Sequence, residues 1–241
     1  MEKKPSIEVC LSPALFKFNN IESKNIVVID VLRATSTICN ALHKGATSVI
    51  PVENTEDCFR YEGDEYILAG ERNGQIAEGF HFGNSPLEYT KEVIEGKTLV
   101  LTTTNGTKCL NMAKSARKVI AGSFPNLSIV AADLLKEQRD VILFCAGWKD
   151  HFNLEDTLFA GAIIELLKYD FLISDDSGFA ARQLYVNSAD HIYDVIRHSS
   201  HFKRLSQFGV FDDIEFCLTA DLAPVLPVLN NNHHLENKLK E

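Results

Sequence analysis

The sequence has no excess of basic residues and no long apolar run. Lysine and arginine number 24 against 33 aspartates and glutamates, which gives a formal net charge of −9. Because phosphate backbones are bound through clustered Lys and Arg, this balance argues against a nucleic-acid partner. No apolar run approaches the length of a membrane span, and the start of the chain lacks the apolar core of a signal peptide. We therefore expect a cytoplasmic protein that binds neither nucleic acid nor membrane.

Several signatures of familiar catalytic loops are also missing. The chain has no G-x-S-x-G elbow, no G-x-G-x-x-G fingerprint and no Walker A loop. No cysteine is followed by arginine six positions later, which excludes the cysteine-phosphatase loop. Asp30 has Leu32, not a second aspartate, two positions on, which argues against a haloacid-dehalogenase type of aspartyl phosphatase. The six cysteines are scattered without any C-x-x-C pair, so we expect reduced thiols, mostly in the core.

What the chain does contain is an alternation of short apolar runs and segments with helical periodicity. This rhythm predicts an α/β fold, layered, with a mostly parallel or mixed central sheet flanked by helices. Nearly continuous Val, Ile and Leu in the apolar runs indicate strands covered on both faces. We expect one α/β domain over residues 1–229, or two intimately packed lobes, followed by a frayed polar tail over 230–241. The expected strands are 26–31, 47–52, 66–69, 98–103, 118–121 and 140–145, and the expected helices 35–44, 106–116, 126–137, 155–168 and 177–185, with 191–206 helical but broken.

The first strand ends in an acid, an arginine and three hydroxyls. Asp30 lies at the carboxyl end of the run, Arg33 follows, and Thr35, Ser36 and Thr37 open the next helix. Free N–H groups and a partial positive charge at a helix start favour an anion, to which Arg33 adds a planar fork of donors. Asp30 would repel such an anion unless a cation bridges them. The combination therefore suggests Mg²⁺.

A second polar strand end follows the run at 98–103. Thr104, Asn105, Gly106, Thr107 and Lys108 offer hydroxyls, an amide, close backbone approach and a positive charge to an anion. The alternative is an ordinary strand-to-helix turn with Thr or Asn as the helix cap. The two β-turn-α-β units resemble each other, and both strand ends are candidates for the same crevice.

Three further segments carry candidate groups. Glu71 and Arg72 lie in a glycine-punctuated loop after a strand, where one could hold a cation and the other an anion. Ser85 and Glu88 fit a capping box, whereas Asn84 stays open as a ligand contact.

Asp156, beside Glu155, begins a helix, where it either complements the helix dipole or reaches a metal. His198 and His201 share a helical face without a third ligand nearby, which favours a solvated face over zinc.

Taken in order, these motifs resemble the 2-phosphosulfolactate phosphatase family over nearly the whole chain, from about Ser6 to Leu229. The ordered set is far more specific than any single motif. The motifs are Asp30-Val31-Leu32-Arg33-Ala34-Thr35-Ser36-Thr37, Gly70-Glu71-Arg72, Gly79-Phe80-His81-Phe82-Gly83-Asn84-Ser85-Pro86, Thr103-Thr104-Asn105-Gly106-Thr107, Cys145-Ala146-Gly147 and Glu155-Asp156. The resemblance leads us to expect Asp at position 81 in many relatives, so His81 in this chain argues against a metal-ligand role at that position.

The resemblance implies a Mg²⁺-dependent phosphatase that hydrolyses 2-phospho-3-sulfolactate to 3-sulfolactate and phosphate, a step toward coenzyme M. A doubly anionic substrate calls for cationic groups and helix N-termini, and a hard cation calls for carboxylate oxygens. Whether Asp30 forms a phospho-aspartate or only holds Mg²⁺ and orients water stays open. The expected catalytic residues are Asp30, Arg33, Glu71 and Arg72, the metal ligands Asp30, Glu71 and Asp156, and the substrate contacts Thr35, Ser36, Thr37, Asn84, Thr104, Asn105, Gly106, Thr107 and Lys108.

Three other functions compete with this one. The first is a phosphatase of another small phosphorylated acid, such as a phosphorylated carboxylate. The second is a cofactor-using transferase or oxidoreductase with a Rossmann-like site, against which the missing glycine fingerprint counts. The third is a non-catalytic binding protein for phosphorylated acids, which calorimetry without turnover would reveal. A homodimer is compatible with the sequence.

Overall fold

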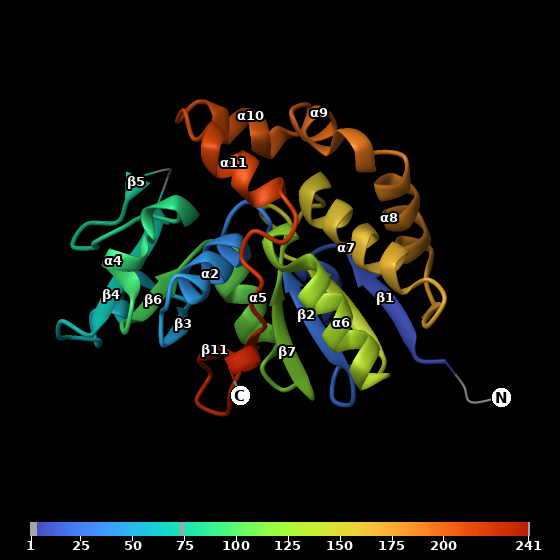
Figure 1. The fold of residues 1–241 in the computed structure, drawn as a ribbon, viewed down its shortest axis with the longest axis horizontal. Coiled ribbons are helices and arrows are strands. Elements are labelled where there is room, and N and C mark those ends of the chain that lie inside the picture. Colours follow the sequence, from blue (N-terminus) through green and yellow to red (C-terminus); the bar gives the residue numbers. More distant parts are fainter. Residues whose placement is uncertain (1–3, 73–74, 241) are drawn as a thin grey trace.

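The computed structural model describes residues 4–72 and 75–240, and their strands form an eleven-stranded mixed sheet flanked by helices (Figure 1). This confirms the layered α/β fold predicted from the sequence. The strands are β1 Ser6–Cys10, β2 Asn25–Ile29, β3 Ser48–Val52, β4 Tyr66–Arg72, β5 Gln75–Ile76, β6 Thr98–Thr102, β7 Lys118–Gly122, β8 Val141–Cys145, β9 Leu172–Ile173, β10 Pro227–Leu229 and β11 Leu235–Asn237. The helices are α1 Pro13–Phe16, α2 Ala34–His43, α3 Thr55–Cys58, α4 Lys91–Ile94, α5 Gly106–Ala113, α6 Leu127–Glu137, α7 Leu154–Leu167, α8 Asp176–Val186, α9 Ile192–Ile196, α10 Ser200–Ser206 and α11 Phe211–Leu218.

The sheet consists of two parallel blocks that run in opposite directions. One block contains β7, β2, β8, β1 and β9, and the other contains β3, β6 and β4. Between them lies the hairpin β10–β11, which pairs antiparallel with β7 on one side and with β3 on the other. Three successive antiparallel pairings reverse the strand direction from one block to the next, so the sheet is mixed.

The polar tail is part of this sheet, which corrects the expectation that residues 230–241 are frayed. β11, Leu235–Asn237, pairs with both β10 and β3, and Leu235 is fully buried. Asn230 and Glu236 join across the hairpin by a hydrogen bond of 2.7 Å. The tail is ordered because it supplies a strand that both blocks need. A polar composition predicts fraying only where a segment finds no such partner.

Two crossover helices connect the blocks. Helix α2 leads from β2 in the larger block to β3 in the smaller one, and α5 leads from β6 in the smaller block to β7 in the larger. The two helices pack against each other. The two similar β-turn-α-β units of the sequence are therefore the two crossover connections, one leading from each block to the other. Their polar turns, after β2 and after β6, meet at one place.

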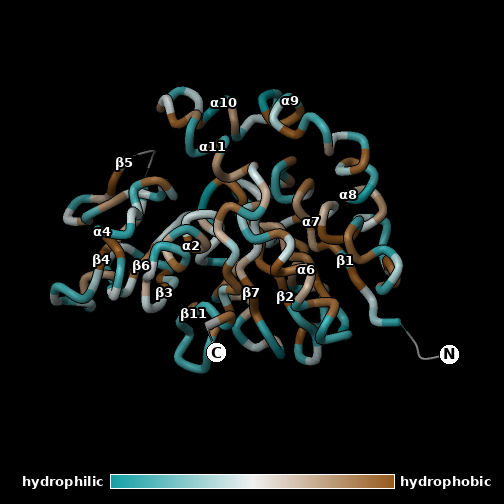
Figure 2. Tube along the Cα trace, viewed as in Figure 1, coloured by the Kyte–Doolittle hydropathy of each residue, from teal (hydrophilic) through white to brown (hydrophobic). Residues whose placement is uncertain are grey.

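The core lies on both faces of the larger block. Val27 and Ile29 of β2 pack under α6 and α7, whereas Ile26 and Val28 pack on the opposite face under α2 and α5. All of these side chains are fully buried, as predicted for strands covered twice. Figure 2 shows the apolar strands inside the molecule and the polar segments on its outside. All six cysteines are buried and free, which confirms the expected core thiols.

The six predicted strands and five predicted helices are present, with boundaries shifted by a few residues. The segment 191–206 is helical but broken, as expected, into a short 3₁₀ turn, α9 and α10. The sequence analysis missed the strands β1, β5, β9, β10 and β11 and the helices α1, α3, α4 and α11. Among the helices of the described residues, none is both long and apolar enough to cross a membrane.

Candidate functional site

A cavity of about 390 Å³ opens where β2, β4, β6 and β8 end, and helix α10 closes its far side. It therefore receives residues from both blocks of the sheet and from the C-terminal helices. Its lining is rich in charged and polar groups, and Trp148 and residues of α10 form an apolar wall. The lining residues are Asp30, Leu32, Arg33, Glu71, Asn84, Thr103, Thr104, Asn105, Trp148, Lys149, His201, Arg204, Leu205 and Phe208.

Asp30 is fixed by the turn that follows β2. Its backbone N–H donates to Thr35 Oγ1 at 3.0 Å, and Ala34 N–H donates to its carboxylate oxygen Oδ1 at 3.4 Å. Burial raises the pKa of Asp30 to about 6, and the backbone N–H groups of Ala34 and Gly106 oppose that rise. A carboxylate with a pKa near neutrality, on the wall of a cavity, is typical of a functional group.

Gly106 makes room for this carboxylate. A Cβ at position 106 would lie 2.7 Å from Asp30 Oδ2 and 2.6 Å from Ala34 Cβ. Gly106 opens helix α5, so its lack of a side chain allows the turns after β2 and β6 to approach each other. Gly106, predicted as a substrate contact, is packed against Asp30 and is not among the residues that line the cavity.

Arg33 lies on the cavity wall between two carboxylates. Its Nη2 donates to Glu71 Oε2 at 2.6 Å, and its Nη1 donates to Asp213 Oδ2. Asp213 also accepts a hydrogen bond of 2.6 Å from Ser85 Oγ. Arg33 and Asp213 are 7% and 5% exposed, so this ion pair is buried. The arrangement fixes the guanidinium and neutralises its charge.

The three hydroxyls at the start of α2, which the sequence predicts as substrate contacts, are not among the residues that line the cavity. Thr35 Oγ1 accepts from Asp30 N–H, Ser36 Oγ donates to Val31 O at 2.8 Å, and Thr37 Oγ1 donates to Asn84 O at 3.0 Å. All three side chains are buried. They hold the turns around the site in place.

The turn after β6 divides into a cavity-lining part and a structural part. Thr104 and Asn105 line the cavity as predicted, together with Thr103. Thr107 exchanges hydrogen bonds with Thr103, including one of 2.9 Å from Oγ1 to the Thr103 carbonyl, and is buried. Lys108 lies outside the cavity lining and pairs with Asp150 at 3.1 Å. Thr107 therefore joins the first turn of α5 to the end of β6, whereas the N-cap residue Asn105 makes no side-chain capping hydrogen bond.

The carboxylates expected to form a metal site do not assemble as a set. Asp156 is fully buried and accepts hydrogen bonds from Val31 N–H, Gly147 N–H and the Asn153 amide at 2.9 to 3.0 Å. Glu71 is engaged by Arg33. In the described ranges, 4–72 and 75–240, no cluster of three or more His, Cys, Asp or Glu side chains could hold a metal ion. Of the three predicted ligands, Asp30 alone is buried, lines the cavity and has no ion-pair partner within those ranges. It fits Mg²⁺, which proteins commonly hold through one or two carboxylates, waters and substrate phosphates.

The remaining predicted residues are Asn84 and Arg72. Asn84 lines the cavity, and its Oδ1 is buried without a hydrogen-bond partner among the described residues. Arg72 ends β4, directly after Glu71, but its side chain lies outside the described part of the structure. The expected capping box at Ser85 and Glu88 is wrong, because Ser85 bonds to Asp213 and Glu88 accepts from Gly83 N–H.

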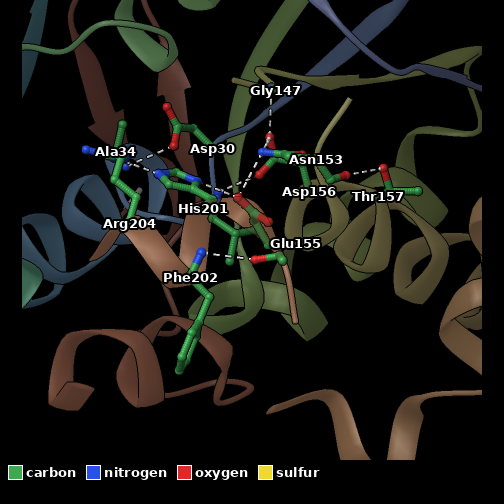
Figure 3. A network of polar contacts seen from close by, with 12 residues as sticks. Asp30, Ala34, Gly147, Asn153, Glu155, Asp156, Thr157, His201, Phe202 and Arg204 are labelled. Carbon is green, nitrogen blue, oxygen red and sulfur yellow. Dashed lines mark hydrogen bonds and ion pairs between the residues drawn. The ribbon is translucent and has the colours of Figure 1, made fainter. Parts of the chain in front are cut away.

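The sequence analysis missed the contribution of the C-terminal helices. His201 is buried, against the expectation of a solvated face, and its Nδ1 lies 2.6 Å from Glu155 Oε1 (Figure 3). Arg204 reaches His201 Nε2 at 2.8 Å. His201, Arg204, Leu205 and Phe208 recur at positions i, i+3, i+4 and i+7, which is the spacing of one helix face. That spacing could have identified the face but not the cavity that it covers.

Comparisons with known proteins agree with the geometry. The sequence model of the family described as 2-phosphosulpholactate phosphatase matches residues 10–232. A Thermotoga maritima protein named "Probable 2-phosphosulfolactate phosphatase" is 45% identical over 225 residues, covering 93% of this chain and 96% of its own length. A protein of the same name from Caldanaerobacter subterraneus subsp. tengcongensis is 44% identical over 218 residues, covering 88% and 90%. A third, from Clostridium acetobutylicum, is 35% identical over 234 residues, covering 95% and 99%. The chain belongs to the 2-phosphosulfolactate phosphatase family.

Proposed function

We propose that this chain hydrolyses the phosphate ester of 2-phospho-3-sulfolactate to give 3-sulfolactate and inorganic phosphate. The carrying observation is the cavity that joins the Asp30 carboxylate to the cations Arg33, Lys149 and Arg204 in a member of this family. Such a site suits a small substrate that carries several negative charges. The reaction is the step toward coenzyme M that the resemblance implies.

The side chains present supply what phosphoryl transfer requires. The reaction depends on positioning and on neutralising charge at the transferring group more than on covalent chemistry by the protein. Arg33 is fixed by Glu71 and Asp213, so its guanidinium is preorganised on the cavity wall. Thr104 and Asn105 add polar groups from the other block of the sheet. The arrangement accommodates attack either by Asp30 or by a water molecule beside it.

We further propose that activity requires Mg²⁺ and that Asp30 holds the ion. Burial and the neighbouring carboxylate of Glu155 both raise the pKa of Asp30, so its ionised form favours a compensating cation. When bound, Mg²⁺ would neutralise charge on the phosphate oxygens. Asp156 would then act indirectly, by fixing the turns after β2 and β8 through Val31 and Gly147.

Phosphate release from a panel of phosphorylated sulfonates and carboxylates tests the proposal. We expect the highest kcat/KM with 2-phosphosulfolactate, loss of activity with EDTA, and recovery when Mg²⁺ is added back. Higher kcat/KM with a phosphorylated carboxylate would replace the substrate while keeping the chemistry. Tight binding of these acids without any phosphate release would refute the enzymatic function, and full activity in EDTA would refute the Mg²⁺ requirement.

A further inference from the structure

Arg204 is a cation on the cavity wall that lacks a carboxylate partner. It lies on α10, and within the described ranges no Asp or Glu oxygen is in salt-bridge distance of its guanidinium. Its Nε is buried without any hydrogen-bond partner in that same part of the chain. A buried donor left unsatisfied costs free energy, so this group is ready for an acceptor that the protein itself does not supply.

The other cations near the site are differently placed. Arg33 is neutralised by two carboxylates, and Lys108 is paired with Asp150 outside the cavity. Lys149 lines the cavity next to Trp148, with its Nζ 5.4 Å from the centre of the ring. Arg204 therefore offers a second positive group, separate from Arg33 and supplied by helix α10.

A histidine and a glutamate hold Arg204 in position. Arginine can only donate, so its contact of 2.8 Å with His201 Nε2 makes that nitrogen the acceptor. The proton of the neutral ring is then on Nδ1, which donates to Glu155 Oε1 at 2.6 Å. Figure 3 shows the ring of His201 connected to Arg204 on one side and to Glu155 on the other. Glu155 is fully buried, so it provides a fixed end to this chain of contacts.

Trp148 fixes the plane of the guanidinium. The Cζ atom of Arg204 lies 4.3 Å from the centre of the Trp148 ring, and the ring of His201 lies 5.3 Å from the same tryptophan at 30°. Stacking on an aromatic face directs the edge of the guanidinium outward. Leu205 and Phe208 add apolar surface to this wall of the cavity.

We propose that Arg204 binds the sulfonate group of the substrate, and that Glu155 and His201 are positioning residues that aim it. The inference rests on the proposed function and adds the group that distinguishes this substrate from simpler phosphorylated acids. A guanidinium is weakly hydrated, and a sulfonate spreads its charge over three oxygens, so both lose little solvation beside Trp148. The phosphate would then lie toward Asp30 and Arg33.

Substrate discrimination tests the assignment by kinetics. We define it as kcat/KM for 2-phosphosulfolactate divided by kcat/KM for 2-phospholactate, which lacks the sulfonate. We expect Arg204→Gln to lower this ratio about 10- to 100-fold, the range for a lost charge-assisted hydrogen bond, and Arg204→Lys to lower it less. His201→Gln should lower the ratio as well, because Arg204 loses its acceptor. Lys203→Gln, an exposed change of the same charge on the same helix, is the matched control and should leave the ratio unchanged.

Calorimetry measures the binding of 3-sulfolactate and of lactate, the dephosphorylated forms of the two substrates, without any turnover. It therefore tests this inference separately from the proposed function. We expect the unaltered protein to bind 3-sulfolactate at least about 10-fold more tightly than lactate, and Arg204→Gln to abolish most of that difference. An equal loss of both affinities would assign Arg204 to the carboxylate and overturn the inference, as would no change in either. Should the unaltered protein release no phosphate yet keep an Arg204-dependent preference for 3-sulfolactate, the phosphatase function fails and the sulfonate assignment stands.

Discussion

Asp213 connects helix α11 to the turn after β2, and its replacement should both destabilise the protein and impair the site. Its carboxylate bonds to Arg33 and to Ser85, and the ion pair is buried on both sides. Asp213→Asn keeps the shape of the side chain but removes the negative charge. Arg33 would then lie buried with Glu71 as its remaining carboxylate.

The expected loss of stability follows from this geometry. Breaking a buried ion pair by removing one partner costs about 3–5 kcal/mol, because the other charge is left uncompensated. Glu71 still neutralises part of the Arg33 charge, so we expect the lower end, about 3 kcal/mol. With a urea m-value of about 3 kcal/mol/M, the unfolding midpoint would fall by about 1 M.

Urea unfolding followed by circular dichroism measures this shift, and phosphate release below the transition measures the effect on the site. Asp212→Asn is the matched control, because Asp212 is the exposed neighbour of Asp213 on the same helix. It should move the midpoint by less than about 0.2 M, as expected for a surface change of within about 0.5 kcal/mol. Equal midpoints for the two variants would refute the inference that the Arg33 charge depends on Asp213.

Two further predictions concern Asp30, which lines the cavity, and Lys108, which does not. Asp30→Asn should abolish most activity and also change the pH dependence of stability. The pKa of Asp30 rises from 3.8 to about 6 on folding, so the folded state holds the proton more tightly, and stability is lost as pH rises through that interval. About two pKa units at about 1.4 kcal/mol each correspond to a fall of roughly 3 kcal/mol in the unfolding free energy. Asp30→Asn should not show this fall. An equal fall in the variant and the unaltered protein between pH 4 and pH 7 would contradict the assignment of the effect to Asp30. Lys108→Gln should lower the free energy of unfolding by less than about 1 kcal/mol, because the side chains of Lys108 and Asp150 are 48% and 50% exposed. The variant should also leave KM within about two-fold of the unaltered protein. A tenfold rise in KM would instead show that Lys108 contacts the substrate.

Much of the fold could be predicted because the apolar runs are local signals. A strand such as β2, buried on both faces, requires consecutive apolar residues, and a helix such as α5 buries residues at the helical spacing 106, 109, 110 and 113. β11 gave no such signal, because its pairing with β10 and β3 depends on partners that are distant in the sequence. The same limit applies to β1, which pairs with β8 more than 100 residues later.

The sequence by itself determined the chemical character of the site. Asp30 and Arg33 follow β2, Glu71 lies near the end of β4, and both strands end at one cavity. These residue types indicate an anionic ligand wherever they meet. The order of the motifs also indicated the family that the comparisons confirm. These properties depend on the kinds of side chain and on short spacings, which a sequence states directly.

Only the tertiary structure decided which groups face the ligand and which support the groups that do. Hydroxyls at 35–37 and the acid at 156 turned inward because buried N–H and C=O groups nearby required partners. His201 and Arg204 reached the cavity, and Asp213 reached Arg33 on its wall, from helices more than 160 residues beyond Asp30. Such contacts depend on how the two blocks and the C-terminal helices pack together, and no local pattern encodes that packing.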